Sequence, residues 1–167
     1  MISFQKIWVI LLALCVATLL IACGAQEEPT PVVIEEPEPT STSWDDLTDE
    51  ERYAGLPDDF VQLLKVAVEE GREEAGHDLY LTQACAGCHM LSPEEVVGPT
   101  FYNIGNNAIN RQPGVSPAQH LYTSIIDTDA FVPKGYLAGV MPADYSEKLN
   151  TEQLVDLVAY LINQRAQ

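Results

Sequence analysis

The chain has 167 residues, 25 of them acidic and 8 basic, and its formal net charge is −17. This charge argues against a nucleic-acid-binding protein, which needs a basic surface to bind phosphates, and the length suits one domain with appended segments. The four cysteines, at positions 15, 23, 85 and 88, do not predict a disulfide framework, because two lie in or at the end of an apolar leader and two are close together.

Residues 1–22 are predicted to be a signal peptide. Lys6 precedes a run of sixteen residues, from 7 to 22, with a single polar member, and a small residue stands before Cys23. The sequence from Leu20 to Cys23 resembles the lipobox of bacterial lipoproteins, and this resemblance implies that the leader is cut before Cys23 and that the Cys23 sulfur carries a lipid. The alternative is an uncleaved helical anchor, although sixteen residues fall short of the roughly 20 that cross a bilayer core.

Residues 23–57 are predicted to be the lipidated cysteine followed by a disordered, acidic, proline-rich linker. Twelve acidic residues and one basic residue lie between Glu27 and Asp59, and four prolines lie between positions 29 and 39. Such a segment buries too little apolar surface to offset its chain entropy. The folded domain is therefore expected over residues 58–167.

Two helices are expected before the second pair of cysteines. From Asp59 to Glu70 the apolar residues recur at helical spacing, and Gly71 ends the run. A second helix, from about Arg72 to Ala84, leads into the cysteine pair. The first helix either docks neighbouring subunits or covers the apolar core of its own domain, and the sequence favours neither role.

Cys85, Cys88 and His89 form a C-x-x-C-H motif, the attachment signature of c-type haem. Two thiols one turn apart can add to the two vinyl groups of one porphyrin, and the adjacent histidine is then held at the iron as an axial ligand. The alternatives are a thioredoxin-like dithiol, half of a zinc site and a chance match. A dithiol needs no following histidine, and the other cysteines cannot complete a zinc site in an exported lipoprotein. The motif therefore predicts one covalently bound haem c.

Met141 is predicted to be the second axial ligand of the haem iron. It stands between turn-forming residues in a loop before a C-terminal helix, from which a thioether can reach the opposite haem face. Met90 lies on the wrong side of the motif. A bis-histidine site that uses His77 or His120 is the alternative, although each fits better as a surface or helix residue. A histidine and methionine pair raises the reduction potential relative to two histidines.

Two further helices complete the pattern. One is expected over Pro117–Ile126, and the other begins at a capping box, Asn150–Gln153, and continues as an apolar stripe to Ile162. No segment alternates convincingly as a strand. The predicted fold class is therefore all-α, a small helical bundle closed on a cofactor.

Residues from about 75 to 164 resemble class I cytochrome c. The resemblance rests on Gly76 and Tyr80, on the sequence Gly98–Phe101, and on the run from Ser124 to Pro142. It implies the small class I cytochrome c helical fold around one haem, to which this chain adds an extra N-terminal helix and the acidic tether. It also implies that Gly76 and Tyr80 allow a close crossing with the C-terminal helix near Tyr160.

The same resemblance implies two roles around the haem. The carbonyl of Pro99 accepts a hydrogen bond from the axial histidine, and Arg111 pairs with a haem propionate. The alternatives are a simple turn at Pro99 and a solvated loop charge at Arg111.

The run from Ser124 to Pro142 is most similar to monohaem cytochromes of respiratory oxidases and quinol-oxidising complexes, such as alternative complex III. This similarity implies single-electron transfer, without catalysis of its own, by a lipid-anchored subunit on the periplasmic or extracytoplasmic face of a bacterial membrane. The expected partners are the membrane, the other subunits of a respiratory or photosynthetic complex, and a redox donor or acceptor protein, but no nucleic acid. The alternatives are an independent tethered shuttle and, from another class, a haem-based small-ligand sensor or peroxidase.

Overall fold

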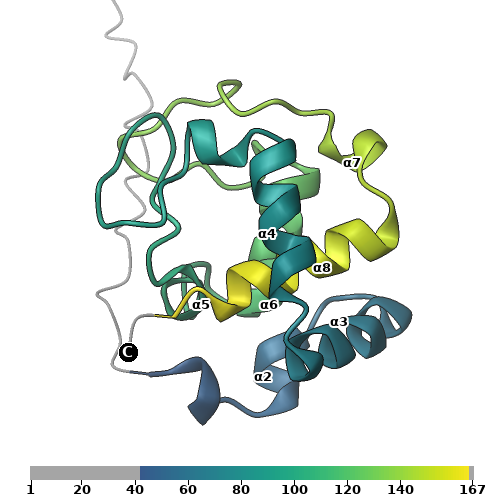
Figure 1. Ribbon diagram of the computed structural model, residues 1–167. Coiled ribbons are helices and arrows are strands. Elements are labelled where there is room, and N and C mark those ends of the chain that lie inside the picture. The colour runs from purple at the N-terminus through teal and green to yellow at the C-terminus, as the bar shows by residue number, and fades with distance from the viewer. Residues whose placement is uncertain (1–41, 166–167) are drawn as a thin grey trace, which may run out of the picture. The chain divides into compact units, whose positions relative to one another are not determined.

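The computed structural model describes residues 42–165, which form helices and no strand (Figure 1). The elements are η1 (Trp44–Asp46), α2 (Asp49–Tyr53), α3 (Asp58–Glu70), α4 (Glu73–Thr82), η2 (Cys85–Gly87), α5 (Ile104–Asn107), α6 (Pro117–Ile126), α7 (Tyr145–Lys148) and α8 (Thr151–Asn163). The all-α prediction is confirmed for this part of the chain. Within 42–165 no helix combines the length and the apolar character needed to span a membrane. The predicted signal peptide, Cys23 and the linker up to residue 41 lie outside the described residues.

Local capping signals set the helix boundaries. At the start of α8 the Asn150 side chain accepts a hydrogen bond from the Gln153 N–H at 2.9 Å, and the Gln153 side chain accepts one from the Asn150 N–H at 3.0 Å. At the start of α6 the Ser116 hydroxyl accepts a single hydrogen bond from the Gln119 N–H at 3.2 Å, ahead of a proline at the first helical position. α3 ends at Gly71, whose φ of 64° is left-handed. The predicted capping box and the helices over 59–70 and 117–126 are therefore confirmed.

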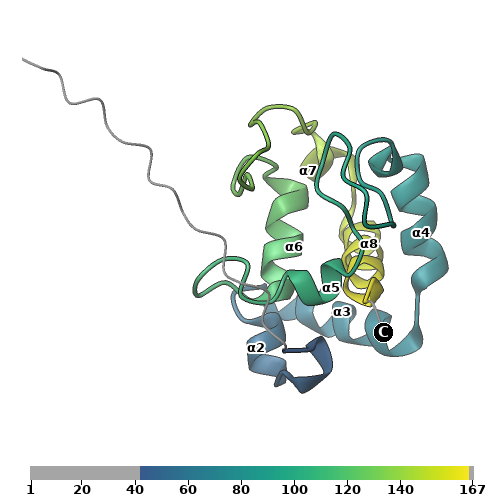
Figure 2. The ribbon, with the colours of Figure 1, turned by 90° about the vertical axis from the view of Figure 1, so that its left-hand side faces the viewer.

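α4 crosses α8 at a glycine, and the two views of the ribbon show the crossing from different sides (Figures 1 and 2). A Cβ atom on Gly76 would overlap the Cβ of Tyr160 and the carbonyl oxygen of Asp156, so only glycine permits this approach. The rings of Tyr80 and Tyr160 lie beside the crossing, with centroids 5.9 Å apart. The Arg72 guanidinium pairs with the buried Asp156 carboxylate at 2.7 Å. The predicted close crossing is confirmed.

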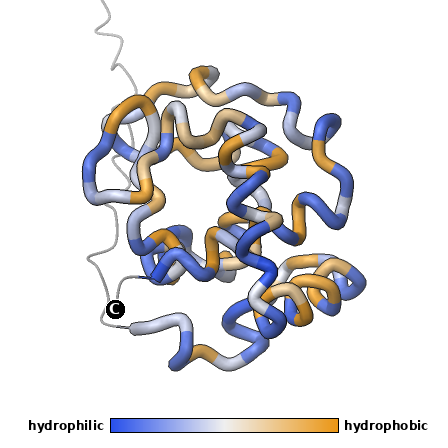
Figure 3. The backbone as a smooth tube through the Cα atoms, viewed as in Figure 1, coloured by the Kyte–Doolittle hydropathy of each residue, from blue (hydrophilic) through white to orange (hydrophobic). Residues whose placement is uncertain are grey.

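α8 is the central helix of the domain, because α3, α4, α5 and α6 all pack against it. Nine consecutive residues of α8 are buried, Leu154 through Ile162. In Figure 3, hydrophobic and hydrophilic positions alternate along α3, as in a helix with one buried face. A helix that is buried on all sides thus organises amphipathic helices around it.

The prediction of a disordered linker over 23–57 is wrong for its C-terminal part, because residues 44–57 pack onto the core. The Trp44 side chain is only 2% exposed, and its backbone N–H donates to Asn106 Oδ1 at 3.0 Å. The Trp44 ring also meets the ring of Tyr53 edge-on, with centroids 5.8 Å apart. The fourteen residues 44–57, directly before the predicted domain boundary, therefore belong to the packed structure.

The acidic residues of this segment do not oppose its folding, because they occupy the first turns of short helices. Asp45 and Asp46 lie in the first turn of η1, and Asp49, Glu50 and Glu51 lie in the first turn of α2. Carboxylates are stabilising at helix N-termini, where backbone N–H groups lack partners. The high acidic content, which predicted disorder for this segment, therefore does not prevent it from folding with Trp44 and Tyr53 buried.

α3 covers the apolar core of its own domain, one of the two roles considered for it. Leu64 and Ala67 are fully buried, and the Phe60 ring meets the Tyr122 ring edge-on with centroids 4.9 Å apart. Leu63 and Val66 of the same helix are 43% and 46% exposed.

Replacing Trp44 by alanine is expected to lower the free energy of unfolding by about 3 to 5 kcal/mol, since the substitution empties a fully buried position of a large side chain. Leu63→Ala is the matched control on an exposed position, and it should cost less than about 1 kcal/mol. Urea denaturation followed by circular dichroism measures both. An unchanged midpoint for Trp44→Ala would mean that residues 44–57 do not pack on the core.

Candidate functional site

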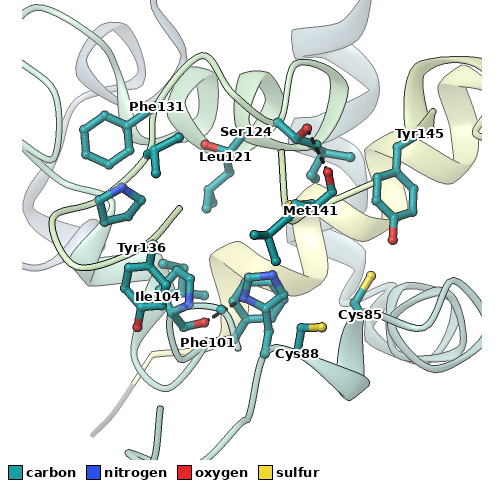
Figure 4. A pocket seen from close by; sticks show the side chains of 18 of the residues that line it. Cys85, Cys88, Phe101, Ile104, Leu121, Ser124, Phe131, Tyr136, Met141 and Tyr145 are labelled. Atoms are coloured by element: carbon teal, nitrogen blue, oxygen red, sulfur yellow. Dashed lines mark hydrogen bonds between the residues drawn. The ribbon is translucent and has the colours of Figure 1, made fainter. Parts of the chain in front are cut away.

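A cavity of about 310 Å³ gathers the predicted site residues of the folded domain (Figure 4). Six of them line it: Cys85, Cys88, His89, Pro99, Arg111 and Met141. The rest of the wall is mainly apolar and includes Phe101, Ile104, Leu121, Ile125, Leu157 and Leu161. Cys23, the seventh predicted residue, lies outside the described part of the chain.

The C-x-x-C-H motif enters the cavity through a tight turn after α4. Ala84 is in the left-handed region, with φ 62°, and the short helix η2 begins immediately after it. The His89 N–H donates to the Cys85 carbonyl at 2.9 Å, and this hydrogen bond continues the helical turn through the motif. Both cysteines and His89 therefore line the same cavity. Burial raises the pKa of the Cys85 thiol, so this thiol is neutral at physiological pH.

The His89 ring is held in one orientation by a hydrogen bond and a stacking contact. Its Nδ1 lies 2.7 Å from the Pro99 carbonyl oxygen, and the ring stacks on Phe101 with a centroid distance of 4.3 Å and an interplanar angle of 7°. A carbonyl can only accept, so Nδ1 carries the proton and Nε2 keeps its lone pair. Burial lowers the pKa of His89, against the opposing effect of the Pro99 hydrogen bond. The neutral ring with a basic Nε2 is the form that binds a metal.

The segment from Gly98 to Phe101 lies directly against the motif. The Gly98 N–H donates to the Cys88 carbonyl at 2.9 Å, and the Phe101 N–H donates to the Met90 carbonyl at 2.7 Å. A Cβ atom on Gly98 would come within 2.5 Å of His89 Cε1. The glycine is therefore required for the close approach that brings the Pro99 carbonyl to Nδ1.

Met141 reaches the cavity from the long loop between α6 and α7. The Thr128 hydroxyl donates to the Met141 carbonyl at 3.4 Å, and Asp129 accepts from the Gly139 N–H at 2.8 Å. Two residues that closely follow α6 thus hold the loop next to Met141. Met90, the other methionine in the described part of the chain, is 38% exposed and does not line the cavity.

The two candidate histidines have different positions. His77 is exposed on α4, beside the rings of Tyr80 and Tyr160, and does not line the cavity. His120 is a helix residue of α6, one of the two interpretations considered for it, but it is 6% exposed and lines the cavity, so it is not a surface residue. The sequence carried no signal for this position, because the lining role of Ser124, one helical turn after His120, is itself known only from the structure.

Arg111 and His120 lie at the same part of the cavity wall. The Arg111 guanidinium carbon is 5.7 Å from the centroid of the Phe131 ring, and the His120 ring meets Phe131 edge-on at 5.2 Å. His120 Nδ1 lies 2.9 Å from Gln112 Oε1. Burial and, to a smaller extent, the charge of Arg111 lower the pKa of His120 to about 4, so this ring is neutral.

These residues fit a haem c. Two thiols, an imidazole nitrogen that retains its lone pair and a thioether line one cavity whose remaining wall is largely apolar, as a porphyrin requires. No group of three or more His, Cys, Asp or Glu side chains in residues 42–165 is placed to hold a metal ion by itself. The fold and the site together define a small helical protein that encloses a covalently attached redox cofactor.

The model of the cytochrome c family matches residues 73–164, which is more than half of the chain. The chain therefore belongs to the cytochrome c family. Neither a curated protein nor a solved structure matches it. A cytochrome c domain of this size typically carries one covalently bound haem c, so the protein is a haem protein of electron transfer. The matched region begins at the start of α4, and η1, α2 and α3 precede it.

Gly98→Ala is expected to displace the His89 ring and to change the visible spectrum of the low-spin haem iron, at a cost in stability of about 1 to 3 kcal/mol. Gly114→Ala is the matched control, because Gly114 has φ 75° but open space around its Cα. That control should lose only about 1 to 2 kcal/mol through backbone strain and keep the spectrum of the unmodified protein. Absorption spectroscopy and urea denaturation of the haem-loaded proteins measure both effects, and an unaltered Gly98→Ala spectrum would contradict the prediction.

Proposed function

We propose that the protein transfers single electrons through one haem c, held by thioether bonds to Cys85 and Cys88 and by axial bonds from His89 and Met141 to the iron. The observation that carries this proposal is the convergence of these four side chains on one cavity, although Met141 is more than fifty residues beyond the motif. Met141 is preferred to His120 because it stands on a loop held by Thr128 and Asp129, whereas the His120 ring packs edge-on against Phe131 beside Arg111.

The haem iron supplies reversible one-electron exchange between Fe(III) and Fe(II). The chain orients and shields it. Pro99 fixes the tautomer of His89 through Nδ1, so that Nε2 would keep its lone pair available to hold the iron. The apolar wall excludes water, which limits the reorganisation that accompanies each change of charge. No proton donor or nucleophile is required, because no bond of a substrate is broken.

Electrons would pass at the rim of the cavity. Val97, Leu137 and Val140 line the cavity and are 53%, 78% and 52% exposed, so they form an apolar edge that a partner protein can approach closely. Such a small apolar contact, without strong charge pairing, suits a transient encounter between redox proteins.

Met141→Ala is expected to open one axial position, so that the reduced protein binds carbon monoxide without denaturant and its reduction potential falls. Met90→Ala is the matched control, since Met90 is exposed and outside the cavity. It should leave the potential and the spectrum unchanged. Carbon monoxide binding by the unmodified reduced protein would instead favour the sensor or peroxidase alternative.

The membrane attachment is a second part of the proposal. A lipid on Cys23, following a cleaved leader, would tether the cytochrome to the extracytoplasmic face of a bacterial membrane, where a short connection keeps it at high effective concentration near its partner. The lipobox sequence before Cys23 supports this attachment. The similarity to monohaem subunits of quinol-oxidising complexes supports a role as a subunit that passes electrons to a periplasmic acceptor.

Cys23→Ala is expected to abolish labelling by a radioactive fatty acid in a bacterial host and to weaken retention in the membrane fraction. Cys15→Ala, which removes the cysteine inside the leader, should be labelled like the unmodified chain.

Mild-detergent extraction of the unmodified protein tests complex membership. Copurification with several other polypeptides supports a subunit, whereas a lone haem protein supports an independent tethered shuttle.

A further inference from the structure

A hydrogen bond from Tyr145 joins the two segments that carry the candidate haem ligands. The Tyr145 hydroxyl donates to the Gln83 carbonyl at 3.1 Å, across 62 positions of the chain. Tyr145 begins α7, four residues after Met141, and Gln83 stands two residues before Cys85. Tyr145 also lines the cavity and is 7% exposed. The bond therefore connects the loop that carries the Met141 thioether to the turn that begins the C-x-x-C-H motif.

The Gln83 carbonyl requires a partner from outside its own helix. Gln83 is the C-terminal cap of α4, and the carbonyl groups at a helix end have no partner within the helix. The next residue, Ala84, has the left-handed conformation with which the chain turns into the motif. In Figure 4 the Tyr145 hydroxyl is directed toward the side of the cavity on which Cys85 lies. The hydroxyl thus contacts the chain at the point where the motif begins.

Tyr145 holds the Met141 loop at a point that the other hydrogen bonds of the loop do not reach. Thr128 bonds the Met141 carbonyl, and Asp129 bonds the Gly139 N–H, so both act at or before the thioether. Tyr145 acts after it. Unlike those two residues, Tyr145 connects the loop to the side of the cavity that carries the cysteines.

We propose that Tyr145 is a positioning residue that keeps the Met141 loop closed on the haem, and that its hydroxyl bond controls how readily a competing ligand replaces Met141 at the iron. This inference rests on the proposed function, because the Met141–iron bond exists only when the cavity holds a haem. In the open state, Met141 has left the iron and the bond between Tyr145 and Gln83 is broken. A hydrogen bond that is present only in the closed state lowers the population of the open state, and a competing ligand binds only the open state.

The test titrates imidazole into the oxidised, haem-loaded protein and follows the near-infrared charge-transfer band of methionine-ligated haem iron. Tyr145→Phe keeps the ring and removes the hydroxyl. Its apparent affinity for imidazole should rise roughly fivefold, as the loss of one hydrogen bond from the closed state implies. Urea denaturation of the same variant measures its free energy of unfolding. An imidazole affinity that is unchanged or lower in Tyr145→Phe would overturn the inference.

Ser116→Ala is the matched control for a loss of stability alone. The Ser116 hydroxyl donates to the Ala54 carbonyl at 2.8 Å, likewise across 62 positions, and Ser116 does not line the cavity. The variant should lower the free energy of unfolding by an amount comparable to Tyr145→Phe but leave the imidazole affinity unchanged, because local opening and global unfolding are separate processes. An equal rise of affinity in both variants would overturn the inference, since opening would then follow from general instability.

A measurement on the unmodified chain covers the case in which Tyr145→Phe does not fold. Imidazole binding to the haem-loaded protein should increase amide hydrogen exchange over residues 142–149, because the loss of Met141 from the iron breaks the bond between Tyr145 and Gln83. The amides of α8 should stay protected. Unchanged exchange over 142–149 in the imidazole complex would overturn the inference. Failure of the proposed function has a different signature, since the unmodified chain would carry no covalent haem or would lack the methionine-to-iron band before imidazole is added.

Discussion

The close crossing of α4 over α8 is the constraint on which the rest of the domain depends. The absence of a side chain at Gly76 lets the two backbones approach, and the Tyr80 ring then packs beside Tyr160. The hydroxyl of the same Tyr80 donates to the carbonyl of His89, nine residues further along the chain, at 2.7 Å. The helix crossing therefore positions the end of α4, and through it the motif that follows. A shift of α4 along α8 would move both cysteines and His89 together.

The cavity itself is built mostly from loops, and specific hydrogen bonds take the place of regular structure. On one side, the segment after the motif is fixed to it by the Gly98 and Phe101 N–H groups. On the other side, Thr128 and Asp129 hold the loop that carries Met141. A loop has few repeating contacts, so each of these bonds limits its motion more than a single bond within a helix does. The positions of His89 and Met141 would then depend on a few residues that do not bind the iron themselves, such as Gly98, Thr128 and Asp129.

Charge has two separate roles in this protein. Residues 1–59 carry a net charge of −10, more than half of the total of −17, and within this part the acidic first turns of short helices leave Trp44 and Tyr53 free to pack. Around the cavity the charged residues are few, and Arg111 is the one cation in its described wall. The acidity of the chain is therefore a property of its N-terminal part and does not define the surface through which electrons would pass.

The sequence alone determined the features that depend on neighbouring residues. The C-x-x-C-H motif, the capping box at Asn150 and the helical spacing of the later helices are local patterns, since the interactions behind them span three or four residues. Sequence similarity added the bond between His89 and Pro99. Only the tertiary structure decided that Trp44 belongs to the core and that His120 lines the cavity. Both outcomes depend on residues outside the three or four positions that a local pattern covers, Asn106 for Trp44 and Phe131 for His120, and a local pattern does not contain the position of such a neighbour.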